Sequence, residues 1–364
     1  MTVIEDLSAF IISGRVKAHP SPDSETAART PAQGVDDAVE AERIGFRRIF
    51  LSERWNLKEA GAILGSAGAR TTRLELGTGV LNPASRHPLH MAAFGSTMHA
   101  LHGPRLVLGL GRGDDGVFKG TGLRAASFDG IVDYVDILRR LWRGETVSYD
   151  GPAGTYPRLA LGDLHDGPAP QVWFGTFGLP KGARAAAQAF DGVLLVPNLT
   201  PEATRATVTR IHEECERIGR DPASIRIAQC VITAPELDEV ETRQIVHARA
   251  VTYLQAPGYG HSLVRINDWD PDVLRRLAEH RQLASGEEIA DARFHRAELV
   301  EPARLVPDEW MYDSCAIGTV DECVTSLARF RDAGADEIVT YGSTPGQNAA
   351  LARAWAAARR TAHA

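Results

Sequence analysis

The sequence predicts a (β/α)8 barrel, and three observations support this fold class. The chain has 364 residues, a length that suits one such barrel with insertions. Short apolar runs alternate with helix-like segments about eight times along the chain. The runs are continuous rather than alternating apolar and polar, which is typical of parallel strands covered on both faces. A doubly wound open sheet is the alternative, but this number of repeats favours a closed barrel.

The first four repeats are recognised from apolar strands and from the residues that bound their helices. Strands are expected at residues 9–12, 47–51, 74–81 and 105–110, and helices at 33–44, 60–69, between the third and fourth strands, and at about 129–142. Gly45 fits the position just past a helix end, where positive φ suits glycine. Asp129 is the expected N-cap of the last of these helices, whose apolar stripe begins at Ile131.

The last four repeats include two stretches without a clear period. Strands are expected at residues 171–174, 192–196, 225–232 and 337–341, and helices at 183–190, 200–219, 236–255, 319–334 and 349–360. We interpret residues 145–170 as a surface excursion. Residues 256–316 are too long for a plain loop and are interpreted as an inserted helical subregion. We therefore expect one barrel domain over residues 1–364 with these two irregular insertions.

The composition and net charge of the chain restrict the kinds of molecule that it is expected to bind. The net charge of −7 gives no electrostatic reason to expect nucleic acid or an anionic membrane as a partner. The first ten residues have no basic run before an apolar stretch, and no apolar run approaches ~20 residues, so we expect neither a signal peptide nor a membrane span. The four cysteines are scattered, which favours free thiols in a reducing cytoplasm, and no metal-binding spacing is present. We expect a cytoplasmic protein that acts on a small molecule.

The loop after the fourth strand contains a glycine motif, and we reject its usual interpretation as a dinucleotide-binding site. Gly111-x-Gly113-x-x-Gly116 has the GxGxxG spacing, but no helix is expected to open at the third glycine, so a Rossmann site is not indicated. These glycines are better suited to bringing backbone close to a flat ligand. Asp114 and Asp115 are candidates for general acid–base groups, or they only form a turn.

The stronger anion-binding candidate is the stretch GTFGLPKG, residues 175–182, between the fifth strand and a helix. Free N–H groups and the dipole at a helix start favour an anion, and Lys181 adds a full charge. The alternative is a tight turn with a solvated lysine. Phosphate sites in barrels usually follow strands seven and eight, so a site after strand five is atypical.

Polar residues also follow the second and third strands. Glu53, Arg54 and Trp55 together could bind a heteroaromatic ligand; alternatively, Glu53 and Arg54 form an ion pair while Trp55 covers apolar surface. Arg86 and His87 precede Pro88 after the third strand. We interpret Arg86 as a residue that positions a ligand, and His87 as a packed histidine.

At these same loops the sequence resembles the bacterial luciferase-like superfamily, and within it the deazaflavin-dependent (coenzyme F-420) oxidoreductases. The matching stretches are LSERWN, GTGVLNPASRHP, RLVLGLGRGD, GTFGLPKGARAA, DGVLLVPN and CAIGTVDEC, which cover most of residues 40–200 and 315–345. The resemblance implies a barrel with the cofactor at the C-terminal ends of the strands. It also implies a bulge on the third strand with a non-prolyl cis peptide, at Gly79–Val80.

The resemblance further implies the roles of individual residues. Cofactor contacts fall on Glu53, Gly79, Val80, Asn82, Arg112 and Gly113, and the cofactor's phosphate on Gly175, Thr176, Gly178, Pro180, Lys181 and Gly182. Asp114 matches the acidic residue beside the reacting centre in sugar-phosphate dehydrogenases of the group. Those enzymes have a histidine where this chain has Arg54, and an arginine cannot accept a proton at neutral pH. The substrate is therefore not implied.

The expected activity is hydride transfer between reduced coenzyme F-420, an 8-hydroxy-5-deazaflavin, and a small organic substrate. Asp114 is the expected acid–base group, Arg54 an electrophilic anchor, and Trp55 lines the pocket. One alternative is an FMN-dependent monooxygenase that uses dioxygen. Another is a non-catalytic cofactor-binding protein on the same barrel. Dimers are common in this superfamily, and that alone raises the homodimer as an expectation.

Overall fold

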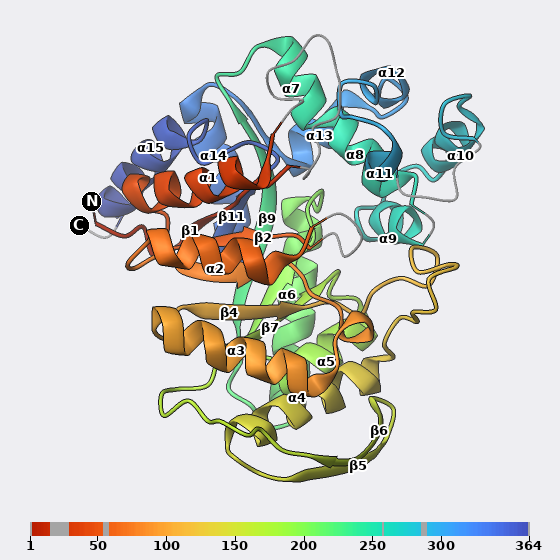
Figure 1. Ribbon diagram of the computed structural model, residues 1–364. Coiled ribbons are helices and arrows are strands. Elements are labelled where there is room, and N and C mark those ends of the chain that lie inside the picture. The colour runs from red at the N-terminus through yellow and green to blue at the C-terminus, as the bar shows by residue number, and fades with distance from the viewer. Residues whose placement is uncertain (1, 15–28, 54–57, 257, 285–289, 363–364) are drawn as a thin grey trace. The chain divides into compact units, whose positions relative to one another are not determined.

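The computed structural model describes residues 2–14, 29–53, 58–256, 258–284 and 290–362 (Figure 1). The chain divides into two compact units. Unit 1 comprises Met1–Arg47, Val196–Ala206 and Gln229–Ala364, and unit 2 comprises Arg48–Leu195 and Thr207–Ala228. None of the helices in the described ranges is long and apolar enough to cross a membrane.

Unit 2 is built from parallel strands that each lead into a helix. Its strands, in their order across the sheet, are β2 (Arg48–Leu51), β3 (Glu75–Thr78), β4 (Leu106–Leu110), β7 (Gln171–Thr176) and β8 (Gly192–Leu195). Its helices include α2 (Ala60–Arg70), α3 (Pro88–His102), α4 (Phe128–Trp142) and α5 (Pro180–Ala189), and successive helices pack side by side (Figure 1). The strands are almost wholly buried, as their continuous apolar runs predict.

Unit 1 contains β1 (Leu7–Phe10), β10 (Ala316–Gly318), β11 (Glu337–Tyr341) and most of β9 (Arg226–Pro235), which enters it at Gln229. The order is β10-β9-β11-β1. The β1–β11 and β10–β9 pairs are parallel. Helices α1 (Pro31–Ile44), α14 (Val320–Asp332) and α15 (Ala349–Ala362) pack together, and α6 (Pro201–Arg217) begins in this unit. The short strand β10 is an element that the sequence analysis missed.

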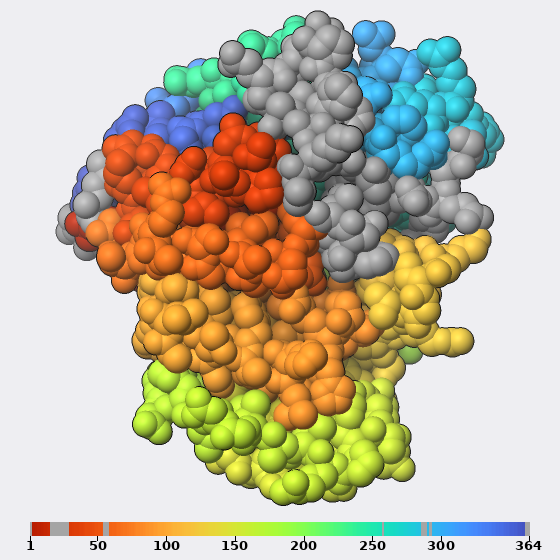
Figure 2. Space-filling model, in the orientation of Figure 1, coloured from red at the N-terminus to blue at the C-terminus, as the bar shows by residue number. Residues whose placement is uncertain are grey.

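The two stretches without a clear period have regular structure. Residues 147–159 form an antiparallel hairpin of β5 (Val147–Gly151) and β6 (Gly154–Leu159), which the sequence analysis did not predict. Most of its residues are exposed, and Figure 2 shows this yellow-green segment at the surface. The described residues between 258 and 315 form a series of short helices, in line with the expected helical subregion. They contain α9 (Tyr259–Ile266), α10 (Asp272–Glu279), α11 (Ala290–Arg293), α12 (Val300–Ala303) and α13 (Asp308–Ser314).

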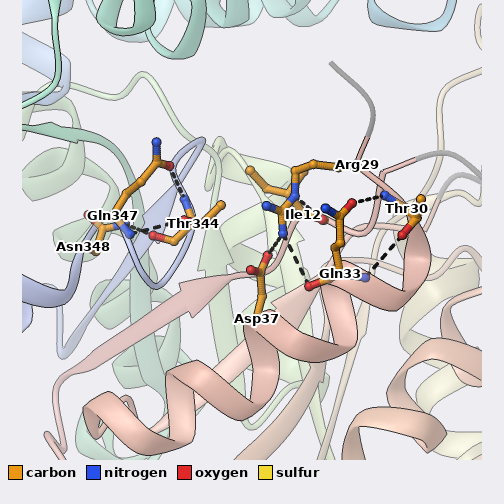
Figure 3. A network of polar contacts seen from close by, with 8 residues as sticks. All are labelled: Ile12, Arg29, Thr30, Gln33, Asp37, Thr344, Gln347 and Asn348. Carbon is orange, nitrogen blue, oxygen red and sulfur yellow. Dashed lines mark hydrogen bonds and ion pairs between the residues drawn. The ribbon is translucent and has the colours of Figure 1, made fainter. Parts of the chain in front are cut away.

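Capping residues determine where the helices begin. The Thr319–Glu322 capping box is confirmed, and α1 begins with a second one between Thr30 and Gln33 (Figure 3). The prediction of Asp129 as an N-cap is wrong: α4 begins at Phe128, and the hydroxyl of Ser127 accepts a hydrogen bond from the backbone N–H of Gly130. Asp129 lies instead in the first turn, where its negative charge interacts favourably with the positive end of the helix dipole.

The predicted helix over residues 236–255 is two helices, α7 (Glu239–Ile245) and α8 (His247–Leu254). They meet at Val246, which has a ψ of −68°. α7, α9, α10, α11 and α12 all pack against α8, which therefore forms the centre of this helical region.

His99 on α3 is buried in a way that requires a neutral ring. Its Nδ1 lies 2.9 Å from the carbonyl oxygen of Pro168, and its Nε2 lies 3.2 Å from the backbone nitrogen of Leu106. A neutral ring protonated on Nδ1 donates to the first and accepts from the second, whereas an imidazolium cannot accept from Leu106. Burial lowers the pKa of His99 below its usual 6.5, although the hydrogen bond to Pro168 raises it.

We expect the free energy of unfolding to fall as the pH drops below about 6.5. Below that pH the unfolded chain protonates His99, while the folded chain resists until its own lower pKa is reached. Each unit of difference between the two pKa values is worth about 1.4 kcal/mol. Urea unfolding at several pH values should therefore show that the free energy of unfolding falls more steeply with decreasing pH in the wild type than in His99→Gln. The control is His90→Gln, which replaces an exposed histidine on the same helix and should keep the wild-type dependence of the free energy of unfolding on pH. The same pH dependence in all three proteins would contradict this account.

Candidate active site

The C-terminal ends of β2, β3, β4 and β7 lie at one edge of the sheet of unit 2. Leu51 pairs with Thr78, Leu81 bridges to Leu110, and Leu110 pairs with Phe174. Because the strands are parallel, the loops that follow them all start at this edge. The predicted site residues that the structure describes lie in these loops, at the end of β7 or in the first turn of α5. Arg54 and Trp55 lie outside the described residues.

The chain after β3 makes the expected bulge. The peptide bond between Gly79 and Val80 is cis, as the resemblance implied. The N–H of Gly79 donates to Leu51 on β2 at 2.8 Å, and the N–H of Leu81 donates to Gly109 on β4 at 2.9 Å. The backbone therefore bonds to one neighbouring strand before Val80 and to the other after it.

The side chain of Val80 fills space that two glycines leave open. A Cβ atom on Gly111 would lie 2.5 Å from Val80 Cγ2, and a Cβ atom on Gly175 would lie 2.6 Å from Val80 Cγ1. Both separations are too short for carbon atoms. The close neighbour of Gly111 is thus the Val80 side chain, where the sequence analysis expected the approach of a flat ligand.

We expect Gly111→Ala to lower the free energy of unfolding by about 1–3 kcal/mol through overpacking against Val80. Val80→Ala in the same chain should recover part of the loss, because it removes the methyl groups that clash. The checks are urea unfolding and a double-mutant cycle with a coupling of about 0.5–3 kcal/mol. Gly65→Ala on α2 is the control: its Cβ would meet nothing within 4 Å, and it should stabilise the helix by about 0.5–1 kcal/mol. Additive effects of the Gly111 and Val80 substitutions would contradict the packing account.

The loop after β4 is a series of turns, and the next helix starts only at Phe128. This confirms the rejection of a Rossmann site, which needs a helix opening at Gly116. Gly113 has a φ of +79° and lies over the ring of buried Phe118. The side-chain oxygen of Asn82 points toward this loop, 3.4 Å from where a Cβ on Gly113 would lie.

Arg112 and the two aspartates hold this loop in shape. The Nε of Arg112 donates to the carbonyl of Ala126 at 2.6 Å, and its guanidinium lies 4.0 Å from the centre of the Phe128 ring. Burial lowers the pKa of Arg112, while Asp115 and Asp114 raise it. Asp114 Oδ1 accepts from the N–H groups of residues 116 and 117 at 2.8 and 3.2 Å, and Asp115 Oδ1 accepts from residue 125 at 2.8 Å. Both aspartates are exposed and form turns through one oxygen, which leaves the other oxygen of Asp114 without a partner among the described residues.

The first turn of α5 offers open hydrogen-bond donors. Its N-cap, Leu179, has no side chain that can accept a bond, so the N–H groups of Lys181 and Gly182 have no capping partner among the residues that the structure describes. Pro180 at the first position has no N–H to satisfy. Gly182 lets this turn approach the Thr176 hydroxyl, because a Cβ there would lie 2.6 Å from Thr176 Oγ1. Lys181 is exposed beside these donors.

The loop that leads into α5 is fixed by contacts on both sides of Gly178. The N–H of Gly178 donates to Thr176 Oγ1 at 3.1 Å, and the carbonyl of Gly178 accepts from Arg210 at 2.8 Å. Gly178 has a φ of +64°, a conformation that favours glycine. The sequence analysis missed Arg210, because nothing in the spacing of α6 signals a contact with a loop so far away in sequence.

Glu53 pairs with Arg86. The guanidinium of Arg86 lies 2.5 Å from a carboxylate oxygen of Glu53 and 2.5 Å from one of Glu59. The side chain of Glu53 is only 4% exposed, that of Arg86 19%, and that of Glu59 53%. The carbonyl of Arg86 accepts from the Tyr134 hydroxyl at 2.9 Å, which fixes the backbone of this loop. The sequence analysis gave Arg86 a ligand-positioning role and missed both of its carboxylate partners.

Glu59 is also the N-cap of α2, where it accepts from the N–H groups of Gly61 and Ala62. Burial raises the pKa of Glu59, but the bonds from Arg86 and these N–H groups outweigh it, and the net pKa is lowered. Glu59 is therefore ionised at neutral pH and shares Arg86 with Glu53. Among the residues that the structure describes, no group of three His, Cys, Asp or Glu side chains could hold a metal ion.

Comparisons with known proteins identify the family and the relatives that this chain resembles. The model of a family described as luciferase-like monooxygenase matches residues 11–337. A 5,10-methylenetetrahydromethanopterin reductase from Methanolobus tindarius is 24% identical over 313 residues, which cover 85% of this chain and 89% of that protein. An F-420-dependent glucose-6-phosphate dehydrogenase from Nakamurella multipartita is 31% identical over 206 residues, which cover 52% of this chain and 60% of that protein.

A solved structure extends the likeness to the whole fold. The coenzyme F-420-dependent tetrahydromethanopterin reductase from Methanopyrus kandleri superposes with a TM-score of 0.76 at 19% identity, covering 96% of this chain and 97% of that chain. The fold is therefore an eight-stranded parallel (β/α)8 barrel, which confirms the predicted fold class. The loops described above lie at the C-terminal ends of barrel strands, where barrel enzymes have their active sites.

Proposed function

Because this chain belongs to the luciferase-like monooxygenase family, we propose that it is an oxidoreductase that transfers a hydride between coenzyme F-420 and a small organic substrate. The observation that carries the proposal is the shared edge of unit 2, where Val80 adjoins Gly111 after β4 and Gly175 of β7, and β7 leads into the uncapped start of α5. Two proteins similar to this chain are F-420-dependent by name, a dehydrogenase and a reductase.

The described residues fit a deazaflavin with a phosphate-bearing tail. Lys181 and the N–H groups of Lys181 and Gly182 would bind the phosphate, since an uncapped helix start and a cation both favour an anion. The side chains of Val80 and Thr207 occupy the space beside Gly175 and Gly178, so these two glycines do not leave room for the tail. The amide of Asn82 would donate to or accept from the ring. When bound, the deazaflavin supplies the carbon that gives or takes the hydride.

Asp114 is assigned the acid–base role in this proposal. Its Oδ1 is used in the turn, and its second oxygen remains to exchange a proton with the substrate oxygen as the hydride moves to or from the substrate carbon. A carbonyl that gains a hydride on carbon needs this proton on oxygen, and an alcohol that loses a hydride must give it up. Arg54 and Trp55 keep the roles that the resemblance implies, polarising the substrate oxygen and lining the pocket.

A second candidate function is an FMN-dependent monooxygenase that uses dioxygen. The description of the matching family favours it, since that description names a monooxygenase. The two functions differ in their need for dioxygen, because hydride transfer consumes none.

Turnover without dioxygen is the experiment that tests the proposal. Purified protein with reduced coenzyme F-420 and a panel of small carbonyl compounds should oxidise the cofactor in an anaerobic cuvette at the same rate as in air. The reverse panel uses oxidised cofactor and small alcohols. Substrate-dependent oxidation that stops when dioxygen is removed would contradict hydride transfer and support the monooxygenase.

A further inference from the structure

The turn that leads into α5 is held by one face of α6. A Cβ atom on Gly178 would lie 2.2 Å from Thr207 Cγ2 and 3.7 Å from Ile211 Cδ1, so the Cα of this glycine rests on the helix. The carbonyl oxygen of Gly178 accepts from Nη1 of Arg210 at 2.8 Å. Thr207, Arg210 and Ile211 are three and four residues apart and therefore share one face of α6. All four residues belong to unit 2.

The bond from Arg210 fixes the peptide group between Gly178 and Leu179. This peptide is planar and trans, so its carbonyl and its N–H point in opposite directions. With the carbonyl bound to Arg210, the N–H of Leu179 points away from that side chain, and it has no partner among the described residues. It adds a third open donor to the N–H groups of Lys181 and Gly182. A reversed peptide would present a carbonyl in its place, and the partial negative charge of a carbonyl oxygen repels an anion.

The side chain of Thr176 adds a nearly buried donor to the same turn. Thr176 is 9% exposed, and its Oγ1 accepts from the N–H of Gly178 at 3.1 Å. Its own hydroxyl proton has no acceptor within the described part of the chain. The same oxygen would lie 2.6 Å from a Cβ atom on Gly182, which places it beside the first turn of α5. Because a buried donor without an acceptor costs free energy, this turn is complete only when an acceptor binds to it.

Arg210 makes its contact with a carbonyl group and with no carboxylate. It is half-buried and forms no ion pair in the ranges that the structure describes, and Glu214 on the same helix pairs with other arginines. Arg220 offers a close comparison, because it donates to the carbonyl of Ala187 near the other end of α5, also at 2.8 Å. Two arginines therefore hold α5 and its leading turn, and only Arg210 acts at the end with the open donors.

We propose that Arg210 is a positioning residue for the anion site at the start of α5. By holding the carbonyl of Gly178 it keeps the next peptide in the orientation that leaves the backbone donors and the Thr176 hydroxyl open to phosphate oxygens. Donors that are already oriented bind an anion more tightly, because less ordering is needed on binding. The inference rests on the proposed function, in which the anion is the phosphate of the cofactor.

The test compares ligands with and without phosphate in fluorescence titrations of the full-length protein. Coenzyme F-420 and 8-hydroxy-5-deazariboflavin form one pair, and FMN and riboflavin form the other. Arg210→Met should weaken binding of coenzyme F-420 at least about fivefold and leave the affinity for the phosphate-free deazaflavin within about twofold, which also shows that the variant is folded. Arg210→Lys should recover most of the loss, because lysine can also donate to the carbonyl.

The matched control is Arg220→Met, which loses the same charge and the same kind of bond at the other end of α5. It should bind both deazaflavins like the wild type. Salt then separates positioning from simple attraction by charge. At about 1 M salt the Debye length is about 3 Å, so the attraction of a charge that does not touch the anion is screened, whereas the bond to Gly178 remains. The loss in Arg210→Met should therefore persist at this salt concentration, and a loss that disappears would overturn the positioning role.

Three other results would overturn the proposal: equal weakening of both deazaflavins, unchanged affinity for coenzyme F-420, or the same loss in Arg220→Met. A wild type that binds each phosphate-free compound as tightly as its phosphorylated partner has no phosphate site to position, which also overturns it. If the wild type prefers FMN to coenzyme F-420, the proposed function fails, and Arg210→Met should then weaken FMN and spare riboflavin. If Arg210→Met does not fold, Arg210→Gln, with a shorter polar side chain, is measured in its place.

Discussion

Asp114→Asn is expected to lower kcat at least 100-fold while the Kd for coenzyme F-420 changes less than about twofold, since general acid–base catalysis is worth about 10²–10⁴ in rate. Asparagine keeps the oxygen that accepts from the N–H groups of residues 116 and 117. The turn should therefore survive, and the only loss is a group that can exchange a proton. Steady-state kinetics and cofactor titration of the same preparation measure both quantities.

Asp115→Asn is the matched control for this prediction. Asp115 is also exposed, and it also accepts a backbone N–H through Oδ1, from Ala125. Its substitution should leave kcat within about twofold of wild type, because no proton-transfer role is assigned to it. If Asp114→Asn and Asp115→Asn behave alike, Asp114 only forms the turn and the acid–base assignment is wrong.

Arg86→Met is expected to lower the free energy of unfolding by about 2–4 kcal/mol at neutral pH. The substitution leaves Glu53, only 4% exposed, without the cation that compensates its burial. The expected loss is below the full value for a buried pair, because Arg86 is itself partly exposed and Glu59 largely so. Glu53→Gln added to Arg86→Met should recover part of the loss, since it removes the uncompensated charge.

The control is Arg43→Met, which breaks an ion pair with Glu40 at the surface, where the two side chains are 67% and 34% exposed. Exposed pairs are worth about 0–1 kcal/mol, so this variant should lose much less. Urea unfolding followed by circular dichroism compares the variants. A loss for Arg86→Met no larger than that for Arg43→Met would show that Glu53 does not need its partner.

Much of the fold follows from local sequence signals. Continuous apolar runs located the strands, because a parallel strand buried on both faces leaves no polar positions. Gly45 and the Thr319–Glu322 box marked helix ends because caps are satisfied within a few residues of the chain. The hairpin at residues 147–159 was missed because its mostly exposed strands lack the apolar runs used to find the others.

The site could be predicted only as a set of loops. Parallel strands place their C-terminal ends at one edge, so the residues after β2, β3, β4 and β7 could be grouped from sequence alone. The contacts among them could not: Arg86 meets Glu53 across 33 residues, and Val80 packs against Gly111 and Gly175 from different strands. Such contacts depend on tertiary packing, for which the residue types give no spacing rule.

The side-chain contacts in unit 1 could not be predicted from the sequence for the same reason. Tyr253 and Tyr341, whose hydroxyl groups are hydrogen-bonded, are 88 residues apart, and residues 256–316 between them have no clear period.

A binding titration of the purified protein with coenzyme F-420 and with FMN tests the central claim most directly. The proposed function predicts that coenzyme F-420 binds at least about tenfold more tightly, a difference of about 1.4 kcal/mol in binding free energy. It also predicts that Lys181→Gln weakens this binding, because in the proposal the lysine and the start of α5 would hold the phosphate. Tighter binding of FMN than of coenzyme F-420 would contradict the account.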